Sequence, residues 1–265
     1  PYVNKGDCGR AFILAGSTGF AGAALLSAKA ALRSGAGYVH LLHRPEMAAV
    51  YDAKIPEVLT LLVPCLPGSH LPDLEALAEQ LSKAAAILIG PGFGLDTWAL
   101  RILEHCLKEV DIPLIVDADG LALISKHPYL CKHLARKNVL LTPHQGEFQR
   151  LCGIDRYTFD QDPLAHLTAF VNKHSAKVLL KSYTTVYCDP HHTFYNTRGN
   201  DGLATGGSGD TLAGIICSFA AQGMPLPLAA INAAYLMGKT AEQLSRRRGT
   251  PSILPSDVIE SLFVW

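Results

Sequence analysis

The segment NDGLATGGSGDTLAGIICSFAAQG, at residues 200–223, places a glycine-rich loop directly in front of an apolar helix. Apolar residues recur after Asp210 with a period near 3.6, which predicts a helix over residues 210–222. The glycines ahead of Asp210 leave the backbone unusually free, so we expect a ligand to approach it closely. Four glycines give the loop this freedom: Gly202, Gly206, Gly207 and Gly209.

Strand and helix patterns also alternate along the rest of the chain. Apolar runs predict strands at residues 11–15, 38–42, 59–63, 86–89, 113–116, 139–141 and 177–180. Helical patterns lie between them at residues 21–33, 71–82, 98–109, 121–125, 147–151 and 163–174. Strands that are apolar throughout and separated by helices are typical of a parallel sheet covered on both faces. The sequence therefore predicts an α/β layered fold.

The pattern changes after Lys181. Residues 184–188 and 193–195 predict an antiparallel hairpin at the edge of the sheet. Long helices are predicted at residues 210–222 and 228–246, and a short last helix at Ser256, whose hydroxyl is a candidate N-cap. No long linker rich in Pro, Ser or Gly divides the chain, so we expect residues 1–265 to form a single domain.

Charge and cysteine content narrow the class of protein. The 23 basic residues balance the 23 acidic ones, so no global field that attracts nucleic acid or an anionic membrane is expected. The three arginines at 246–248 are expected to complement the dipole of the helix that they end. The seven cysteines form no C-x-x-C pair, which argues against a disulfide scaffold or a structural zinc site and indicates a reducing, cytoplasmic compartment. No apolar run of about eighteen residues predicts a membrane span.

Ligands of such folds bind beyond the carboxyl ends of the strands. Glycine recurs in the segments at these ends, together with Asp, His, Lys or Thr. The simplest interpretation is one pocket bordered by these segments and the glycine-rich loop of residues 200–210. The segments are AGSTGFAGAA (15–24), IGPGFG (89–94), VDADGL (116–121), LTPHQGE (141–147) and LKSYTT (180–185).

The sequence partly resembles three well-known binding or catalytic motifs but matches none of them. Gly16, Gly19 and Gly22 fall at G-x-x-G-x-x-G, whereas a dinucleotide-binding loop requires G-x-G-x-x-G. Ser208 stands where a Walker A loop places its phosphate-binding lysine. The same segment misses the last glycine of the G-x-S-x-G motif of serine hydrolases.

The glycine-rich loop nevertheless provides groups suited to phosphate transfer. Backbone N–H groups at the start of a helix can stabilise the negative charge that builds on a phosphate. Asp210, in the same first turn, is a candidate to accept a proton from a substrate hydroxyl. The alternative is that Asp210 only complements the helix dipole, although such a cap needs none of the surrounding glycines.

Other candidates carry two interpretations each. Asp117 and Asp119 follow a strand, where alternation turns at most one of them into the pocket, either to orient a magnesium-bound phosphate or to cap the next helix. His144 is either a ligand contact or a structural residue. Lys181 either meets phosphate charge or extends to water from the end of its strand.

Taken in order, the motifs resemble those of the nucleotide-dependent NAD(P)H-hydrate dehydratases, a repair-enzyme family in the ribokinase-like superfamily. The resemblance covers the chain from Asn4 to about Asp257. It is carried by NKGDCGRAFILAGSTGFAGAALLSAKAALRSGAGYV, IGPGFG, VDADGL, LTPHQGEF and NDGLATGGSGDTLAGI.

The resemblance implies a three-layer α/β/α domain, with a central and mostly parallel sheet, that binds hydrated NADH or NADPH together with ADP or ATP and Mg²⁺. In the family, the nucleotide phosphorylates the hydroxyl on the hydrated nicotinamide ring, and phosphate then leaves to restore the double bond. The expected activity is that of a lyase, more narrowly a hydro-lyase. A homo-oligomer is expected, with no nucleic-acid or membrane partner.

The resemblance also implies roles for individual residues. Asp210 corresponds to the base that activates the hydroxyl and also contacts the substrate. Further contacts to the hydrated dinucleotide are expected from Ala23, Gly94 and His144.

The nucleotide is expected at Gly207, at Gly209 and at one further loop. That loop commonly reads K-G-A-G-T in the family, and here it consists of Lys181, Ser182, Tyr183, Thr184 and Thr185. Two of its glycines are therefore replaced by residues that disfavour positive φ. No metal ligand is identified.

Two other functions compete with this one. A kinase of the same superfamily, such as a hydroxyethylthiazole kinase, would share Asp210 and the glycine-rich loop but release a phosphorylated product. A non-catalytic nucleotide-binding protein is the third possibility. The sequence leaves open the choice between ADP and ATP, the preferred hydrate, the oligomeric state, and whether the epimerase domain of many family members precedes Pro1.

Overall fold

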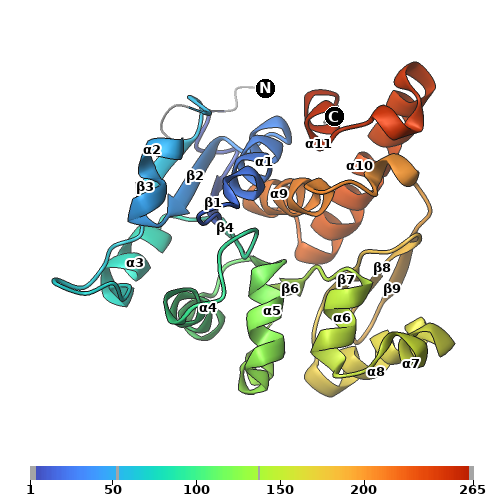
Figure 1. The fold of residues 1–265 in the computed structure, drawn as a ribbon, viewed down its shortest axis with the longest axis horizontal. Coiled ribbons are helices and arrows are strands. Elements are labelled where there is room, and N and C mark those ends of the chain that lie inside the picture. Colours follow the sequence, from blue (N-terminus) through green and yellow to red (C-terminus); the bar gives the residue numbers. More distant parts are fainter. Residues whose placement is uncertain (1–3, 52–53, 137, 263–265) are drawn as a thin grey trace.

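The computed structural model describes residues 4–51, 54–136 and 138–262. Within these ranges nine strands form one sheet in the order β3-β2-β1-β4-β5-β6-β7-β8-β9 (Figure 1). Strands β1 to β7 run parallel to one another, and β8 and β9 add an antiparallel hairpin beside β7 at one edge. The strands are β1 Arg10–Leu14, β2 Tyr38–His43, β3 Leu59–Leu62, β4 Ala86–Ile89, β5 Leu114–Val116, β6 Val139–Leu141, β7 Val178–Leu180, β8 Thr185–Cys188 and β9 Thr193–Asn196.

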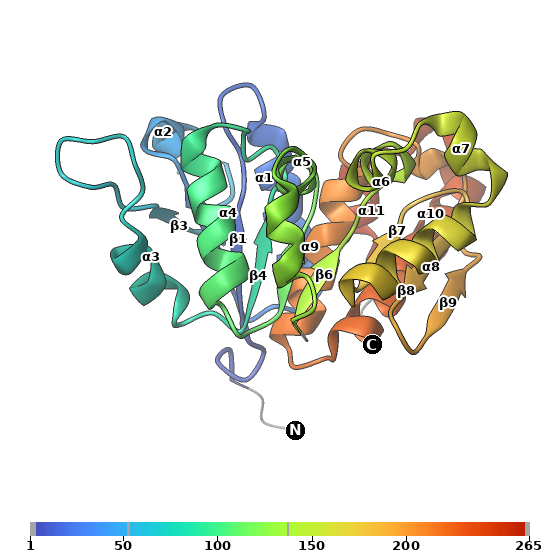
Figure 2. The same ribbon diagram turned by 90° about the horizontal axis from the view of Figure 1, so that it is seen from below.

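Helices cover both faces of the sheet, because the strands are apolar on both sides (Figure 2). One face packs against α1 Ala21–Arg33, α9 Ser208–Ala221, α10 Leu226–Arg248 and α11 Pro255–Glu260. The other packs against α3 Leu74–Leu81, α4 Thr97–Glu109, α5 Asp119–Lys126, α6 Gln145–Cys152, α7 Arg156–Gln161 and α8 Pro163–His174. A short helix, α2 Ala48–Tyr51, lies near β3. The three-layer fold and the edge hairpin are therefore confirmed.

The predicted boundaries differ from the observed ones at a few helices. Helix α9 begins two residues earlier than predicted, so Asp210 is its third residue. Ser256 is not an N-cap, because α11 already begins at Pro255 and the carboxylate of Asp257 accepts the N–H of Leu254 at 3.0 Å. Helix α7 was not predicted from the sequence. In the described part of the chain, no helix is both long enough and apolar enough to span a bilayer.

A close contact between α1 and α9 holds the glycine-rich loop in place. A Cβ atom added to Gly214 of α9 would lie only 2.2 Å from the carbonyl oxygen of Ser27 in α1. The hydroxyl of Ser27 also donates a hydrogen bond to the carbonyl oxygen of Asp210 at 3.1 Å. The first turn of α9 is thus fixed to α1 by packing and by a hydrogen bond.

We expect Gly214→Ala to destabilise the protein by about 2 kcal/mol, since the cost of overpacking exceeds the small gain in helix propensity. Thermal unfolding followed by circular dichroism would measure the change. Gly22→Ala is the matched control, because a Cβ atom there meets nothing within 4 Å. An equal or higher melting temperature for Gly214→Ala would contradict the proposed contact.

Candidate functional site

The carboxyl ends of β5 and β7 meet the start of α9 at a buried ion pair. The ammonium of Lys181, directly after β7, lies 2.7 Å from the Oδ1 atom of Asp117, directly after β5. The Asp117 side chain is 1% exposed. A Cβ atom on Gly209 would lie 3.1 Å from the Lys181 Nζ atom and 3.9 Å from the Asp117 Oδ2 atom. The cation is therefore next to the first turn of α9 and does not extend to water.

The sequence predicted that glycines give this loop unusual backbone freedom, and the structure uses that freedom at Gly207. Gly207 is the N-cap of α9 and has φ +96°, a conformation that favours glycine. A Cβ atom there would also lie 2.5 Å from a methyl carbon of Leu26. A larger residue at this position would move the loop that carries Gly209 and Asp210.

Asp210 lies in this first turn without capping it. Among the described residues, no backbone amide donates a hydrogen bond to its carboxylate. Burial and the nearby charge of Asp117 raise its pKa to about 6, with a further contribution from Asp119 and an opposing one from Lys181. A carboxylate with a pKa close to neutrality is suited to accept and release a proton.

Lys181 is the shared cation of this cluster. Burial works against its charged form, but the carboxylates of Asp117, Glu147 and Asp210 outweigh burial and raise the pKa of its ammonium. Lys181 is thus protonated at neutral pH. A positive charge beside backbone N–H groups at a helix start is an arrangement that binds phosphate.

Asp117 and Asp119 both face neighbouring loops of the site, although strand alternation predicted only one. The reason is Ala118, which has φ +48° and ψ −115° and interrupts the extended chain. The carboxylate of Asp119 therefore accepts the N–H of Gly94 at 2.8 Å. The carbonyl of Asp117 lies against Gly90, where a Cβ atom would be 1.9 Å from its oxygen.

His144 is the N-cap of α6, and both of its ring nitrogens have neighbours in the first turn of that helix. Its Nδ1 atom accepts the N–H groups of Gly146 at 3.1 Å and Glu147 at 3.3 Å. The Glu147 carboxylate in turn accepts the N–H of His144 at 2.8 Å, which completes a capping box. Burial, Lys181 and Arg150 lower the pKa of His144. Because Nδ1 accepts these two amides, the neutral ring carries its proton on Nε2, which lies 3.4 Å from the Oε1 atom of Glu147.

The expected substrate contacts Ala23 and Gly94 lie on neighbouring segments. A Cβ atom on Gly92 would lie 2.7 Å from the Cβ atom of Phe20 and 3.3 Å from that of Ala23, so the two glycine loops touch. The sequence did not identify Arg44, which fixes this region. Its guanidinium binds both carboxylate oxygens of Asp96 at 2.8 Å and donates to the carbonyl of Phe93 at 3.1 Å.

The expected nucleotide loop closes on itself. The hydroxyl of Ser182 donates to the carbonyl oxygen of Thr184 at 2.9 Å, and that of Thr185 approaches the carbonyl oxygen of Ser182 at 3.5 Å. Residues 182–185 have no positive φ, so this conformation does not require the glycines of the family pattern. Tyr183 is 99% exposed. Its side chain therefore makes almost no contact with the rest of the described chain.

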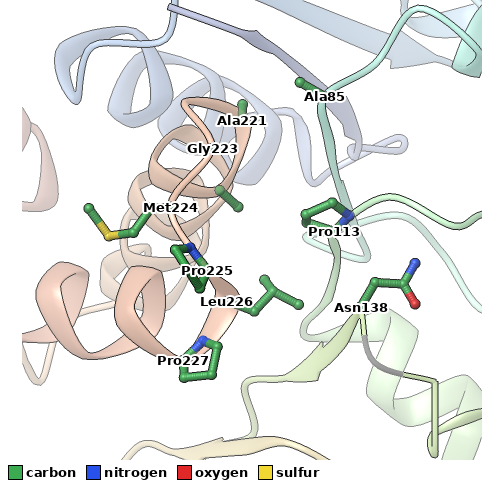
Figure 3. A pocket seen from close by; sticks show the side chains of 10 residues that line it. Ala85, Pro113, Asn138, Ala221, Gly223, Met224, Pro225, Leu226 and Pro227 are labelled. Carbon is green, nitrogen blue, oxygen red and sulfur yellow. The ribbon is translucent and has the colours of Figure 1, made fainter.

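An apolar hollow at the other end of the sheet offers none of these groups. It lies where β4, β5 and β6 begin, next to the end of α9, and has a volume of about 440 Å³ (Figure 3). None of its lining residues is ionisable. The cluster of Lys181, Asp117 and Asp210 at the opposite ends of the strands is therefore the candidate functional site.

Within the described residues, no group of three or more His, Cys, Asp or Glu side chains is arranged to hold a metal ion. All seven cysteines are free, as expected from their number and spacing.

Comparisons with known proteins identify the family to which the chain is similar. Residues 11–263 match the family model described as NAD(P)H-hydrate dehydratase. The chain is 34% identical over 262 residues to the bifunctional NAD(P)H-hydrate repair enzyme Nnr of Moorella thermoacetica, which covers 98% of this chain and 49% of that protein. It is 34% identical over 247 residues to the ADP-dependent (S)-NAD(P)H-hydrate dehydratase of Lactiplantibacillus plantarum, covering 92% and 84% of the two chains.

A solved structure shares the fold over nearly the whole chain. The ADP/ATP-dependent NAD(P)H-hydrate dehydratase of Bacillus subtilis, co-crystallised with ATP and Mg²⁺, has a TM-score of 0.79 and 27% identity, covering 98% of this chain and 89% of that one. The chain spans about half the length of the bifunctional curated relatives that it matches.

The raised pKa of Asp210 predicts a pH-dependent effect on stability. The folded protein holds this proton more tightly than the unfolded chain, so the contribution of Asp210 is most favourable below its ordinary pKa of 3.8 and is lost as the pH rises through about 6. Asn does not titrate. We therefore expect Asp210→Asn to gain stability relative to the native protein between pH 4.5 and about 7.5. Urea unfolding at both pH values measures the difference, and a constant difference would contradict the pKa shift.

Proposed function

The chain belongs to the NAD(P)H-hydrate dehydratase family, and from this premise we propose that it uses ADP or ATP to restore NADH or NADPH from their 6-hydroxy hydrates. The ring hydroxyl attacks the terminal phosphorus of the nucleotide, and the bond to the bridging oxygen breaks. Phosphate then leaves with the ring C–O electron pair, and the adjacent carbon loses a proton to form the double bond. Phosphate is a better leaving group than hydroxide, which explains the need for a nucleotide.

The observation that supports this proposal best is the meeting of Asp210, Lys181 and the first turn of α9. Asp210 accepts the hydroxyl proton as the new phosphate bond forms. Lys181 and the N–H groups at Gly209 and its neighbours stabilise the charge on the transferring phosphoryl group. We expect His144, Ala23 and Gly94 to contact the hydrated dinucleotide.

The phosphoryl donor is proposed from the relatives. One relative is named as ADP-dependent, and the solved structure is of an ADP/ATP-dependent enzyme co-crystallised with ATP and Mg²⁺. The described side chains do not form a three-carboxylate metal site. We therefore expect Mg²⁺ to be held mainly by phosphate oxygens and water, where it neutralises phosphate charge.

The direct test is recovery of the near-ultraviolet absorbance of reduced nicotinamide when the protein is mixed with NADH hydrate, Mg²⁺ and either ADP or ATP. We expect recovery with at least one nucleotide, together with release of inorganic phosphate. Nucleotide binding without recovery would contradict the proposal. A stable phosphorylated product would then indicate a kinase, and no product at all would indicate a binding protein.

Removing the proposed base should separate catalysis from binding. We expect Asp210→Asn to lower kcat by about 10² to 10⁴, because the amide cannot accept the hydroxyl proton, while ADP affinity changes little. Gly209→Val is the contrasting variant, since its side chain fills the space beside the Lys181 ammonium and weakens ADP binding. Near-normal turnover of Asp210→Asn would contradict the proposal that Asp210 is the general base.

A further inference from the structure

Asp117 makes the only hydrogen bond to the Lys181 ammonium within the described residues, and it is itself held rigidly. Its side chain is buried, and its backbone carbonyl lies against Gly90 at a position where no Cβ atom fits. The N–H of Lys181 donates to the carbonyl oxygen of Pro143 at 2.7 Å, so the backbone on the other side of the pair is also fixed. The ammonium therefore has one defined position.

This position matters because it adjoins Gly209, the second residue of the buried helix α9. The Lys181 Nζ atom would lie 3.1 Å from a Cβ atom on Gly209, so that glycine leaves the space in front of the cation open. A free lysine side chain has several rotatable bonds and would sample other positions, including contacts to the other nearby carboxylates, Glu147 and Asp210.

A buried ion pair is also a weak source of stability. The cost of taking two charges out of water can exceed their attraction, and an apolar pair of similar volume is often as stable. A contribution to stability is therefore a weak explanation for the buried ion pair between Asp117 and Lys181. A better explanation is functional, because the pair lies beside the start of α9, where we propose that phosphate binds.

We propose that Asp117 is a positioning residue for the nucleotide: it holds the Lys181 ammonium in front of Gly209, so that the cation is in place before a phosphate arrives. This inference rests on the proposed function only for the identity of the ligand, an adenine nucleotide. Asp117 acts through Lys181 and does not itself touch the phosphate.

A double-mutant cycle tests this dependence. ADP binding is measured by titration calorimetry, in EDTA, for the native protein, Asp117→Asn, Lys181→Gln and the double variant. We expect each single variant to weaken ADP binding about tenfold and the double variant to be no weaker than Lys181→Gln within about twofold, because residues in one network are not additive. Additive losses, or no ADP binding by the native protein, would overturn the proposal.

Two further variants guard against a merely structural effect. Asp117→Glu keeps the charge but moves the carboxylate by one methylene, so we expect weaker ADP binding with a melting temperature close to native. If Asp117→Asn does not fold, Asp117→Glu takes its place in the double-mutant cycle. Asp119→Asn neutralises the other carboxylate of the same segment, which contacts Gly94 and not Lys181, and we expect less than a threefold change in ADP affinity.

The cycle is repeated with Mg²⁺ to exclude a direct role in metal binding. If Asp117 were a metal ligand, its loss would weaken binding only when Mg²⁺ is present, and would do so equally in the Lys181→Gln background. That result would overturn the positioning role. A non-additive cycle without recovery of NADH would instead retain the positioning role and reject the proposed reaction.

The pH profile of turnover gives a second readout. The groups that face Asp210 are Asp117, Lys181 and Asp119, and the charge of Asp117 is the largest of their contributions that raise its pKa. We expect Asp117→Asn to move the acid limb of kcat/KM to lower pH, since a like charge is lost and Lys181 is free to approach Asp210. General loosening of the fold would lower activity without moving this limb, and an unmoved limb would count against the positioning role.

Discussion

The contact between α1 and α9 is the constraint on which the site depends. Gly214 lets the two helices approach so closely that Ser27 reaches the first turn of α9 and binds the carbonyl of Asp210. Most of α9 is buried, so its position also follows from packing on the sheet. Because the helix start is fixed, the freedom of the preceding glycines is confined to the loop. The backbone N–H groups at Gly209 and Asp210 thus have a defined direction, which is the preorganisation that the proposed phosphoryl transfer requires.

The cluster at this helix start places one cation among several carboxylates. The excess negative charge disfavours ionisation of Asp210, since both burial and Asp117 raise its pKa. An incoming phosphate would compete with these carboxylates for Lys181. The site is therefore balanced between holding its cation internally and presenting it to a ligand. This balance depends on the low dielectric of a buried site, where charges that are weakly coupled in water interact strongly.

The fold was predictable from sequence because it depends on patterns that are local. Apolar runs alternating with helices are enough to predict a parallel sheet covered on both faces, and the break after Lys181 predicted the hairpin. The rule that ligands bind at the carboxyl ends of strands also predicted that these loops lie at one edge of the sheet, where the structure has them. The sequence could not predict the orientation of individual side chains. Alternation placed only one of Asp117 and Asp119 toward the site, because the positive φ of Ala118 has no signal in its residue type. The clamp formed by Arg44 and Asp96 joins residues 52 positions apart and was likewise invisible.

The loop of residues 181–185 shows how a family pattern can change without losing its geometry. Glycine is needed where φ is positive, and φ is not positive at Ser182 or Thr184, the two positions where the family pattern has glycine. Where the family has a flexible glycine, this chain has Ser182, whose hydroxyl donates a hydrogen bond to the carbonyl oxygen of Thr184. This hydrogen bond closes the loop. Such a loop loses less entropy when a ligand orders it, because it is already held in one conformation. The replaced glycines therefore do not argue against a nucleotide. They suggest a loop that is rigid before binding, beside a cation whose position is also fixed in advance.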